Sequence, residues 1–344
     1  MSNQLRSAQS RKPERPYMPA ALAVQPLMSG DLVSIQDLQL GEASYLLELG
    51  ALVKASPGQY STALAGRHVA MFFEKPSLRT RLTFEVGVAK MGGTASFADH
   101  GGSRLDAREK LSDIAHNLER WVDAIVLRTF NHATVTGMAE HANVPVINAL
   151  TDHEHPCQAL ADYMTLVEKF GDLRRIRLAW TGDGNNVAHS LMLTAAALGS
   201  AITVATPPGY EPDGGVVAAA CAIATRTGAK IELTSDPMAA VADADAVYTD
   251  VWASMGQENE AAQRKGIFAR YQVNERLFAR AASHAVFMHC LPAHRGEEVT
   301  DAVIDCPRSV VFDQAENRMH IQKAILLSLL AGGGKRLAVR SVHA

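Results

Sequence analysis

The stretch FFEKPSLRTRLTFE, residues 72–85, follows the apolar run 68–71 and predicts a buried strand, a tight turn at Pro76 and then a helix. Arg79 and Arg81 fall in the first turn of that helix. The first turn of a helix already carries unpaired N–H groups and a partial positive charge, so cations are unfavourable there unless an anion joins them. The stretch therefore predicts an anion site at the junction of a strand and a helix.

Length and composition indicate an ordinary globular protein of two domains. The chain has 344 residues, and its 33 Lys and Arg stand against 36 Asp and Glu, which does not favour a nucleic-acid partner. The longest apolar stretches are too short or too interrupted to span a membrane. Four cysteines lie far apart in the sequence: Cys157, Cys221, Cys290 and Cys306. This spacing favours reduced thiols, and we predict a cytoplasmic protein.

Residues 1–30 form a polar, basic, proline-containing start that lacks the apolar core of a secretion signal. We predict a disordered N-terminal extension. An organellar transit peptide is the alternative, because the segment carries arginines and serines. No clear amphipathic helix emerges in it, which favours the extension.

From about residue 42 onward, strand-like and helix-like segments alternate. The predicted strands are 67–73, 94–98, 124–129, 144–148, 176–180, 201–205, 230–234, 246–248, 285–289 and 310–312. The predicted helices are 77–90, 108–121, 134–141, 187–198, 214–227 and 317–330. Such alternation indicates parallel sheets covered by helices on both faces. We predict an α/β fold with two doubly wound parallel-sheet domains that meet around residues 150–165.

The segment Ser77-Leu78-Arg79-Thr80-Arg81 combines free backbone N–H groups with two hydroxyls and guanidinium groups. All three kinds of donor suit phosphate oxygens. The alternative is an ordinary serine cap with the arginines in solvent, which the helix dipole disfavours. We therefore interpret the segment as a phosphate site.

The segment DHEHPCQALAD, residues 152–162, brings two histidines and a cysteine close together. A metal site is one interpretation, but Pro156 directly follows His155 and no second Cys/His pair has zinc-like spacing. The favoured interpretation is a loop that leads into a helix with Pro156 at its first position. His155 and Gln158 are then placed to hydrogen-bond a carbonyl or amide substrate.

The segment TGDGNNVAHS, residues 181–190, follows a predicted strand and opens a helix, as a dinucleotide-binding loop would. It lacks the third glycine of that motif, and no acidic residue closes the next strand, 201–205. Nicotinamide binding is therefore disfavoured. Asn185 and Asn186 are candidates for contacting a polar small molecule, and a simple capping role for these residues is equally consistent with the motif.

Two further segments end predicted strands with chemically active residues. TDVWASMGQE (249–258) places Asp250 at a strand end, and FMHCLPAHRGEEVTD (287–301) places Cys290 at another. Ligands of open α/β sheets bind at the carboxyl ends of strands, and Asp250 there would suit a cationic amine. Cys290 is either a nucleophile or a small buried thiol, and residue type alone favours the thiol.

Taken together, these segments resemble the aspartate/ornithine carbamoyltransferase family, and among its members the ornithine enzymes. The matching motifs follow the family's order from about residue 31 to 330: SLRTR (77–81), LRTF (127–130), HPCQ (155–158), GDGNN (182–186), DVWASMG (250–256), HCLP (289–292) and AENRMH (315–320). The resemblance implies carbamoyl transfer from carbamoyl phosphate to the δ-amine of L-ornithine, which yields L-citrulline and phosphate for arginine biosynthesis.

The resemblance also assigns roles to single positions of this chain. The residues expected to bind carbamoyl phosphate are Ser77, Leu78, Arg79, Thr80, Arg104, Arg108, Arg128, His155, Gln158, Cys290, Leu291 and Arg318. Those expected to bind ornithine are Asn186, Asp250, Ser254 and Met255, with Asp250 meeting the α-ammonium. The expected catalytic set is Arg79, Arg128, His155 and Cys290. The family needs no metal or organic cofactor and works as a trimer or multiples of it.

The same resemblance implies a division of the chain and a route for the reaction. It places the carbamoyl phosphate domain at 31–151, with the C-terminal segment 318–344 packed back on it, and the ornithine domain at 152–317. A neutral amine attacks the carbamoyl carbon, and donors near the resulting oxyanion stabilise it. Placing the amine beside the acyl donor supplies roughly 7–11 kcal/mol. No dedicated base is evident; the departing phosphate is a candidate to take the amine proton, and Cys290 a candidate to tune the amine.

Three positions depart from the family pattern. Leu78 stands where a threonine is common, and mainly its backbone N–H should matter. Ser103-Arg104 replaces a common Ser-Gln in the loop that the family donates to a neighbouring subunit, and Arg108 stands where a lysine is frequent. Both arginines keep hydrogen-bond donors, but the detailed phosphate contacts of this loop stay open.

Two alternatives remain at this point. One is transfer to another amine, such as aspartate, putrescine or an N-acylated ornithine; Asp250 argues against a dicarboxylate, because two carboxylates would face each other unpaired. The other is a nucleotide-binding dehydrogenase or regulator built on residues 176–199. A citrulline assay and a nicotinamide titration would separate them. The direction of the reaction in the cell and assembly beyond a trimer are open.

Overall fold

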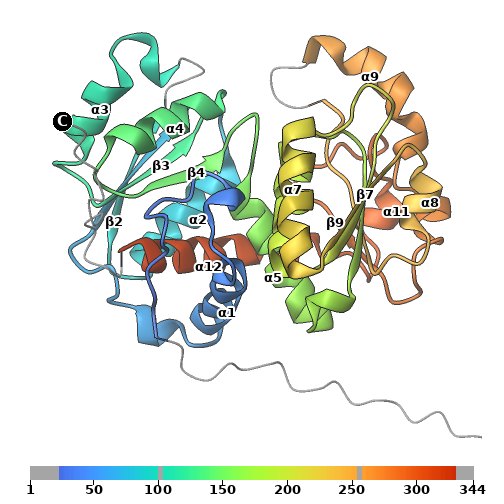
Figure 1. Ribbon diagram of the computed structural model, residues 1–344, viewed down its shortest axis with the longest axis horizontal. Coiled ribbons are helices and arrows are strands. Elements are labelled where there is room, and N and C mark those ends of the chain that lie inside the picture. The colour runs from blue at the N-terminus through green and yellow to red at the C-terminus, as the bar shows by residue number, and fades with distance from the viewer. Residues whose placement is uncertain (1–22, 100–103, 254–257, 331–344) are drawn as a thin grey trace, which may run out of the picture.

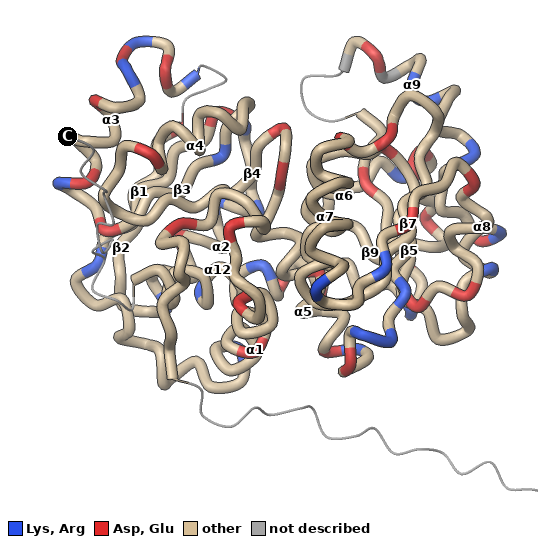
Figure 2. Tube along the Cα trace, in the orientation of Figure 1, with Lys and Arg blue, Asp and Glu red and all other residues tan. Residues whose placement is uncertain are grey.

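The computed structural model describes residues 23–99, 104–253 and 258–330. Two α/β lobes lie side by side in Figure 1, each built on its own sheet. We call the lobe of the earlier residues the first domain and the other the second domain. Basic and acidic positions are interspersed over both (Figure 2). Within the described residues, no helix has the length and apolar character needed to cross a membrane.

The first domain contains a four-stranded parallel sheet in the order β2-β1-β3-β4. Its strands are β1 (His68–Phe73), β2 (Thr94–Asp99), β3 (Ala124–Arg128) and β4 (Val146–Leu150). Its helices are α1 (Glu42–Ala55), α2 (Leu78–Ala89), α3 (Leu111–Leu118) and α4 (His132–His141), with short 3₁₀ turns η1 (Ile35–Asp37), η2 (Pro57–Tyr60) and η3 (Leu105–Ala107). The strand burial is that of a sheet covered on both faces: every residue of β3 is buried.

The second domain contains a five-stranded parallel sheet in the order β7-β6-β5-β8-β9. Its strands are β5 (Arg177–Thr181), β6 (Ala201–Ala205), β7 (Lys230–Thr234), β8 (Ala246–Tyr248) and β9 (Val286–Met288). Its helices are α6 (Asn186–Leu198), α7 (Gly214–Thr227), α8 (Pro237–Val241), α9 (Ala261–Phe268), α10 (Glu275–Phe278) and α11 (Asp301–Ile304), with 3₁₀ turns η4 (Leu173–Arg175), η5 (Glu258–Glu260) and η6 (Ala269–Tyr271).

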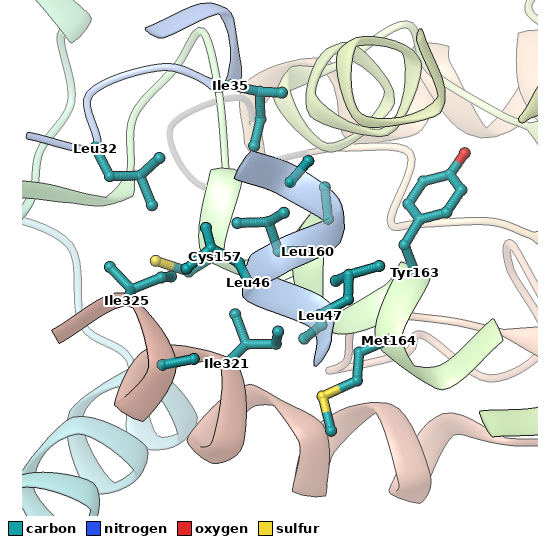
Figure 3. Packing of buried hydrophobic residues seen from close by; sticks show 14 of the residues in the cluster. Leu32, Ile35, Leu46, Leu47, Cys157, Leu160, Tyr163, Met164, Ile321 and Ile325 are labelled. Carbon is teal, nitrogen blue, oxygen red and sulfur yellow. The ribbon is translucent and has the colours of Figure 1, made fainter. Parts of the chain in front are cut away.

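Two long helices join the domains. Helix α5 (Pro156–Phe170) leads from the first sheet to the second, and α12 (Val311–Leu330) returns to pack on α1, α2 and α5. Figure 3 shows the resulting apolar contact, in which Leu46 of α1 lies among residues of α5 and α12. A Cβ at Gly50 of α1 would lie 3.1 Å from Ile321 Cδ1, so glycine permits this close approach.

The order of the strands gives each sheet a switch point. In the first sheet, β2 lies beyond β1 on one side and β4 lies beyond β3 on the other, so the switch point is between β1 and β3. In the second sheet, β6 and β7 lie beyond β5 and β9 lies beyond β8, so the switch point is between β5 and β8. Ligands of open α/β sheets bind at such points, beyond the carboxyl ends of the strands. The SLRTR, LRTF, GDGNN and DVWASMG segments end or follow β1, β3, β5 and β8, the strands at these two points, whereas HPCQ and HCLP follow the adjacent strands β4 and β9.

The predicted fold class is confirmed, and most predicted strands match to within a few residues. The strand predicted at 310–312 is wrong, because Val311 and Phe312 begin α12. Three consecutive apolar residues favoured a strand, yet Val311 is buried whereas Phe312 is 75% exposed, as on a helix at a surface. The helix predicted at 108–121 is shorter, since α3 begins at Leu111 and ends at Leu118.

The extension predicted at residues 1–30 needs a correction at its end. Residues 1–22 lie outside the described chain, but residues 24–30 pack on the first domain. Leu27 is 5% exposed, and its N–H donates to the Ser328 carbonyl at 3.4 Å. Val24 contacts the same apolar cluster. A segment that buries a leucine in this way is part of the domain.

Candidate active site

The start of α2 offers free donors to an anion. Ser77 caps the helix by accepting the Thr80 N–H at 3.3 Å, and the first turn contains no acidic residue. The two arginines of this turn differ. Arg81 pairs with Glu85 at 3.1 Å, and its guanidinium lies 4.0 Å from the Phe97 ring centroid. Arg79 is half-buried and forms no ion pair within the described chain, so Arg79 is the cation left for a ligand.

Arg318 of α12 connects this turn to α5. Its Nη2 donates to Thr80 Oγ1 at 2.9 Å and its Nη1 donates to Gln158 Oε1. All three side chains are at most 3% exposed. The two helices that join the domains therefore hold a guanidinium against the candidate phosphate loop.

Arg128, the last residue of β3, completes a cluster of buried cations. It is 6% exposed, and its Nε donates to the Lys75 carbonyl at 3.2 Å. Burial, together with the nearby Arg318 and Arg79 guanidiniums, lowers the pKa of Arg128 to about 9. A guanidinium loses its proton reluctantly, so this shift indicates a costly burial of the charge, increased by repulsion from the neighbouring guanidiniums. The cluster is arranged for an anion that would relieve it.

His155 lies beside the same cations at the start of α5. It is 5% exposed, and Pro156 follows it at the first helical position, as the sequence indicated. Burial, and then the charges of Arg318 and Arg128, lower the pKa of His155 well below its usual value. The imidazole is therefore neutral at physiological pH and offers one N–H to a carbonyl oxygen.

A buried carboxylate that the sequence analysis missed, Asp162, holds the Gln158 side chain that Arg318 contacts. Asp162 accepts hydrogen bonds from Gln158 Nε2 at 2.8 Å, Gln314 Nε2 at 2.9 Å and the Tyr248 hydroxyl at 3.0 Å. It thereby ties α5 to α12 and to β8. Burial raises the pKa of Asp162 to about 6, even though these bonds and Arg318 lower it.

Asp162 predicts a measurable pH dependence of stability. Its folded pKa is raised above the ordinary value of 3.8, so its contribution is fully present below pH 4 and is lost as pH rises through about 6. Asp162→Asn keeps an acceptor for the two amides and cannot ionise. We expect the free energy of unfolding of the variant, relative to the parent, to increase by ~1–3 kcal/mol between pH 4 and 7 in urea denaturation. A pH-independent difference would contradict the assignment.

The second domain contributes a hydrogen-bonded carboxylate and thiol, Asp250 and Cys290. Cys290 donates its S–H to Asp250 Oδ1 at 3.0 Å, and Asn185 Nδ2 donates to Asp250 Oδ2 at 3.0 Å. Burial and the Asp250 carboxylate raise the pKa of the Cys290 thiol well above its usual value. Cys290 is therefore a protonated donor rather than a thiolate nucleophile. Cys290 lies close enough to Arg128 to influence the pKa of the guanidinium, which places the two groups at one site.

The two asparagines of the GDGNN segment have different contacts. Asn185 caps α6 through the N–H groups of Val187 and Ala188, at 3.0 and 3.1 Å. Asn186 Nδ2 donates to the Thr151 carbonyl. The preceding Gly184 is required by packing, since a Cβ there would lie 2.3 Å from Pro212 N. Asn185 therefore both caps α6 and contacts Asp250 in the candidate site.

Arg264 of α9 is a further residue that sequence reasoning missed. It is 6% exposed, and its Nη1 donates to Asp183 Oδ2 at 2.8 Å and to the Trp252 carbonyl at 2.9 Å. It therefore joins the segment after β5 to the segment after β8. The predicted ligands Ser254 and Met255, which follow Trp252, lie outside the described residues.

Leu291 and the loop after β2 complete the predicted set. Leu291 has a left-handed φ of 59°, and its N–H donates to His289 Nδ1 at 2.8 Å. Arg104 is exposed and paired with Asp106 at 2.8 Å, while Arg108 is exposed. Within the described chain neither arginine contacts the other predicted site residues. The buried Glu74, also missed, fixes this loop by accepting the N–H groups of Leu105 and Phe130 at 2.7 and 2.8 Å.

Two groups of side chains in the described residues have ligand atoms within 4.8 Å of one another, as a metal ion requires. In the first, Asp250 and Cys290 bond each other, and His289 uses both ring nitrogens, for Leu291 N–H and Glu298. The second consists of His294, Glu297 and Glu298, with Glu297 paired to Lys265 at 3.2 Å. In the first group the ligand atoms are already engaged in hydrogen bonds, so that group is not arranged for a metal; in the second, Glu298 Oε2 has no hydrogen-bond partner in the described residues.

The topology and these side chains define a class of protein: a two-domain α/β protein that holds an anion on one sheet and a polar, amine-compatible group on the other. Residues 30–168 match the profile of the aspartate/ornithine carbamoyltransferase carbamoyl-P binding domain, and residues 174–329 match that of the Asp/Orn binding domain. The chain belongs to the aspartate/ornithine carbamoyltransferase family. Membership rules out the alternative of a dehydrogenase built on residues 176–199.

Individual relatives are similar over most of the chain. The ornithine carbamoyltransferase of Anoxybacillus flavithermus is 51% identical over 306 residues, 88% of this chain and 98% of the relative. The Pyrococcus furiosus protein named ornithine carbamoyltransferase, anabolic, is 50% identical over 89% of this chain and 98% of its own. A solved structure of ornithine carbamoyltransferase from Pyrococcus furiosus superposes with a TM-score of 0.86 at 49% identity, covering 91% of this chain and 99% of that one.

Proposed function

We propose that this protein is an enzyme that transfers the carbamoyl group of carbamoyl phosphate to the δ-amine of L-ornithine, with L-citrulline and phosphate as products. The observation that carries the proposal is the close association of the Arg79, Arg128 and Arg318 cations with the Asp250–Cys290 pair. The first set suits a phosphorylated donor and the second an amine acceptor. The relatives named as ornithine carbamoyltransferases support the same assignment.

The first domain and α12 act on the donor. The N–H groups of Ser77, Leu78 and Arg79 and the Arg79 side chain bind the phosphate, since a helix N-terminus favours an anion. Arg128, the Thr80 hydroxyl and the neutral His155 surround the carbamoyl oxygen and stabilise the oxyanion that forms on attack. Because Arg318 already holds Thr80 and Gln158, these donors need little reorganisation as the reaction proceeds.

The second domain acts on the acceptor. Asp250 and Asn186, with Ser254 and Met255, bind ornithine, and Asp250 meets its α-ammonium. The Cys290 thiol stays protonated and bonded to Asp250, so it positions the amine and does not attack the donor itself. Attack by the neutral δ-amine forms the new C–N bond, and collapse of the tetrahedral intermediate breaks the C–O bond to phosphate. The departing phosphate takes the amine proton.

Asp250→Asn is expected to weaken ornithine far more than carbamoyl phosphate. A charge-assisted hydrogen bond contributes about 1.5–3 kcal/mol, so the KM for ornithine should rise roughly 10–150-fold. The KM for carbamoyl phosphate should change less than about threefold, because the arginines expected to bind it, Arg79, Arg128 and Arg318, lie on the first domain and α12. Steady-state assays of citrulline formation measure both constants. Asp213→Asn, at the N-terminus of α7, is the matched control with parental values. Equal losses for the two substrates would show that Asp250 does not bind the amino acid.

We further propose a cytoplasmic homotrimer whose active sites are shared between subunits. Helix α2 presents an exposed apolar stripe beside the phosphate loop, with Leu78, Leu82 and Val86 exposed by 71%, 46% and 40%. Exposed apolar patches of this kind mark association surfaces. In the trimer, Arg104 and Arg108 reach a neighbouring subunit's phosphate site, which explains why they lie apart from the site of their own chain. Four free cysteines support a reducing compartment.

The division of labour follows the predicted domain bounds. Residues 31–151, with the C-terminal segment from 318, bind carbamoyl phosphate, and residues 152–317 bind ornithine. The descriptions of the two matching profiles support this division, although the boundary between the profiles lies at the end of α5 rather than before it. We propose the biosynthetic direction because the Pyrococcus furiosus relative is named anabolic. The enzyme requires no cofactor.

A further inference from the structure

Glu154, which directly precedes His155, is a fully buried carboxyl group between the two domains. Its exposed fraction is 0%. From the first domain it accepts hydrogen bonds from the Ser34 hydroxyl and, at 3.2 Å, from the Ile35 N–H. From α6 of the second domain it accepts the Ser190 hydroxyl at 3.1 Å. No role in substrate binding has been given to any of these residues.

Ser190 carries the contact onward to His155. Its Oγ accepts the His155 backbone N–H at 2.8 Å. A serine hydroxyl has one hydrogen and two lone pairs, so directing the hydrogen to Glu154 leaves its lone pairs for the His155 N–H. The carboxyl group therefore fixes which way the hydroxyl is turned. Without Glu154, the Ser190 hydrogen is free to point toward the same region as the His155 N–H.

The side chain of His155 depends on this backbone anchor. Its Nδ1 is buried and has no hydrogen-bond partner in the described residues. Its backbone, at φ −132° and ψ 67°, is outside the helical region, so α5 does not hold it by a regular helical conformation. The His155 carbonyl accepts the N–H groups of Gln158 and Ala159 at 3.0 and 3.2 Å, so these bonds, the N–H bond to Ser190 and packing together set the position of the imidazole.

We infer that Glu154 is a positioning residue for carbamoyl transfer, which acts through Ser190 to hold the His155 imidazole against the carbamoyl oxygen. The inference rests on the proposed function. Glu154 does not touch substrate. A misplacement of a catalytic group by about 1 Å can cost 10²-fold in rate, so loss of the anchor should appear in kcat.

The experiment compares substitutions at Glu154 with a matched control. Glu154→Leu removes the acceptor with little change in volume. Glu154→Gln restores it: its oxygen accepts from Ile35 and Ser190, and its amide donates to the Ser34 hydroxyl. The control is Asp37→Ala, because Asp37 accepts the Ser34 N–H at 2.8 Å and stabilises the same 3₁₀ turn without contacting Ser190. All are assayed for citrulline formation well below their unfolding temperatures.

We expect kcat of Glu154→Leu to fall about 10-fold or more, with its KM for ornithine within about twofold of the parent. Glu154→Gln should recover most of kcat, and Asp37→Ala should lower thermal stability while keeping kcat. Ser190→Ala should lower kcat as Glu154→Leu does, and the double variant should be no slower than the slower single one. If Glu154→Leu fails to fold, Ser190→Ala still tests whether the hydrogen bond between Ser190 and His155 affects kcat.

Two results overturn the inference while leaving the proposed function intact. One is a Ser190→Ala variant with parental kcat. The other is a Glu154→Leu variant whose kcat matches that of Asp37→Ala, which would make Glu154 a purely structural contact. Failure of the parent protein to form citrulline from carbamoyl phosphate and ornithine would instead overturn the proposed function.

Discussion

An Arg128→Met variant is expected to lose carbamoyl transfer by about 10³-fold and yet to unfold at a temperature no lower than the parent. Arg128 is 6% exposed and lies close to two other guanidinium groups, Arg79 and Arg318. Burial of these like charges is unfavourable until an anion binds, and the lowered pKa of Arg128 expresses that cost. Methionine fills a similar volume and removes the repulsion.

Arg128→Met should also lose most of the rise in unfolding temperature that inorganic phosphate gives the parent. Inorganic phosphate binds the folded parent and raises its unfolding temperature by mass action, whereas the weakened site of the variant should show little rise at the same concentration. Calorimetry with and without phosphate, together with a citrulline assay, measures both effects. Arg81→Met is the control, since Arg81 pairs with Glu85 and lies outside the cluster. An Arg128→Met variant that is strongly destabilised, or that keeps activity, would contradict the role of the cation cluster.

Local signals in the sequence were sufficient to predict which helix starts and strand ends form the site. Pro156 opens α5 as predicted, because proline preferences act within a few residues, and Ser77 caps α2, which the sequence analysis gave only as the alternative to a phosphate site. The position of the polar segments at strand ends followed from the alternation of strands and helices. The roles of single residues, in contrast, came from the resemblance of seven motifs to a family, since residue types alone favoured a buried thiol at Cys290 and left Asn185 undecided.

Other parts of the site could not be predicted, because their contacts join distant parts of the chain. Asp162 bonds Tyr248 and Gln314, which are 86 and 152 positions away. Glu154 and Ser34 are 120 positions apart. No periodicity or spacing marks such pairs before the fold is known. The misassigned strand at 310–312 has a similar origin, since Val311, the first residue of α12, packs with Ala179 and Phe287, which are distant in the sequence.

Complementation between two inactive variants is the second large effect that we expect. Arg79 lies at the phosphate loop. Arg108 is exposed, and within the described chain it contacts no other predicted site residue. In a trimer with shared sites, one site takes Arg79 from one subunit and Arg108 from its neighbour. Arg79→Ala and Arg108→Ala should therefore each be inactive alone, by about 10²-fold or more, because each site lacks one phosphate ligand.

Mixing the two variants under conditions of subunit exchange should restore activity. With equal amounts and random assembly around a cyclic trimer, a subunit with intact Arg79 precedes one with intact Arg108 in about one quarter of the sites, so about one quarter of parental activity should appear. The control mixes the parent with the double variant. It should also reach about one quarter for shared sites, but about one half if each chain builds its own site. Activity that stays absent in the first mixture, with a half in the second, would place both arginines in sites made by single chains. A quarter in both mixtures requires that Arg79 and Arg108 act from different subunits, because only neighbours can then supply the missing guanidinium.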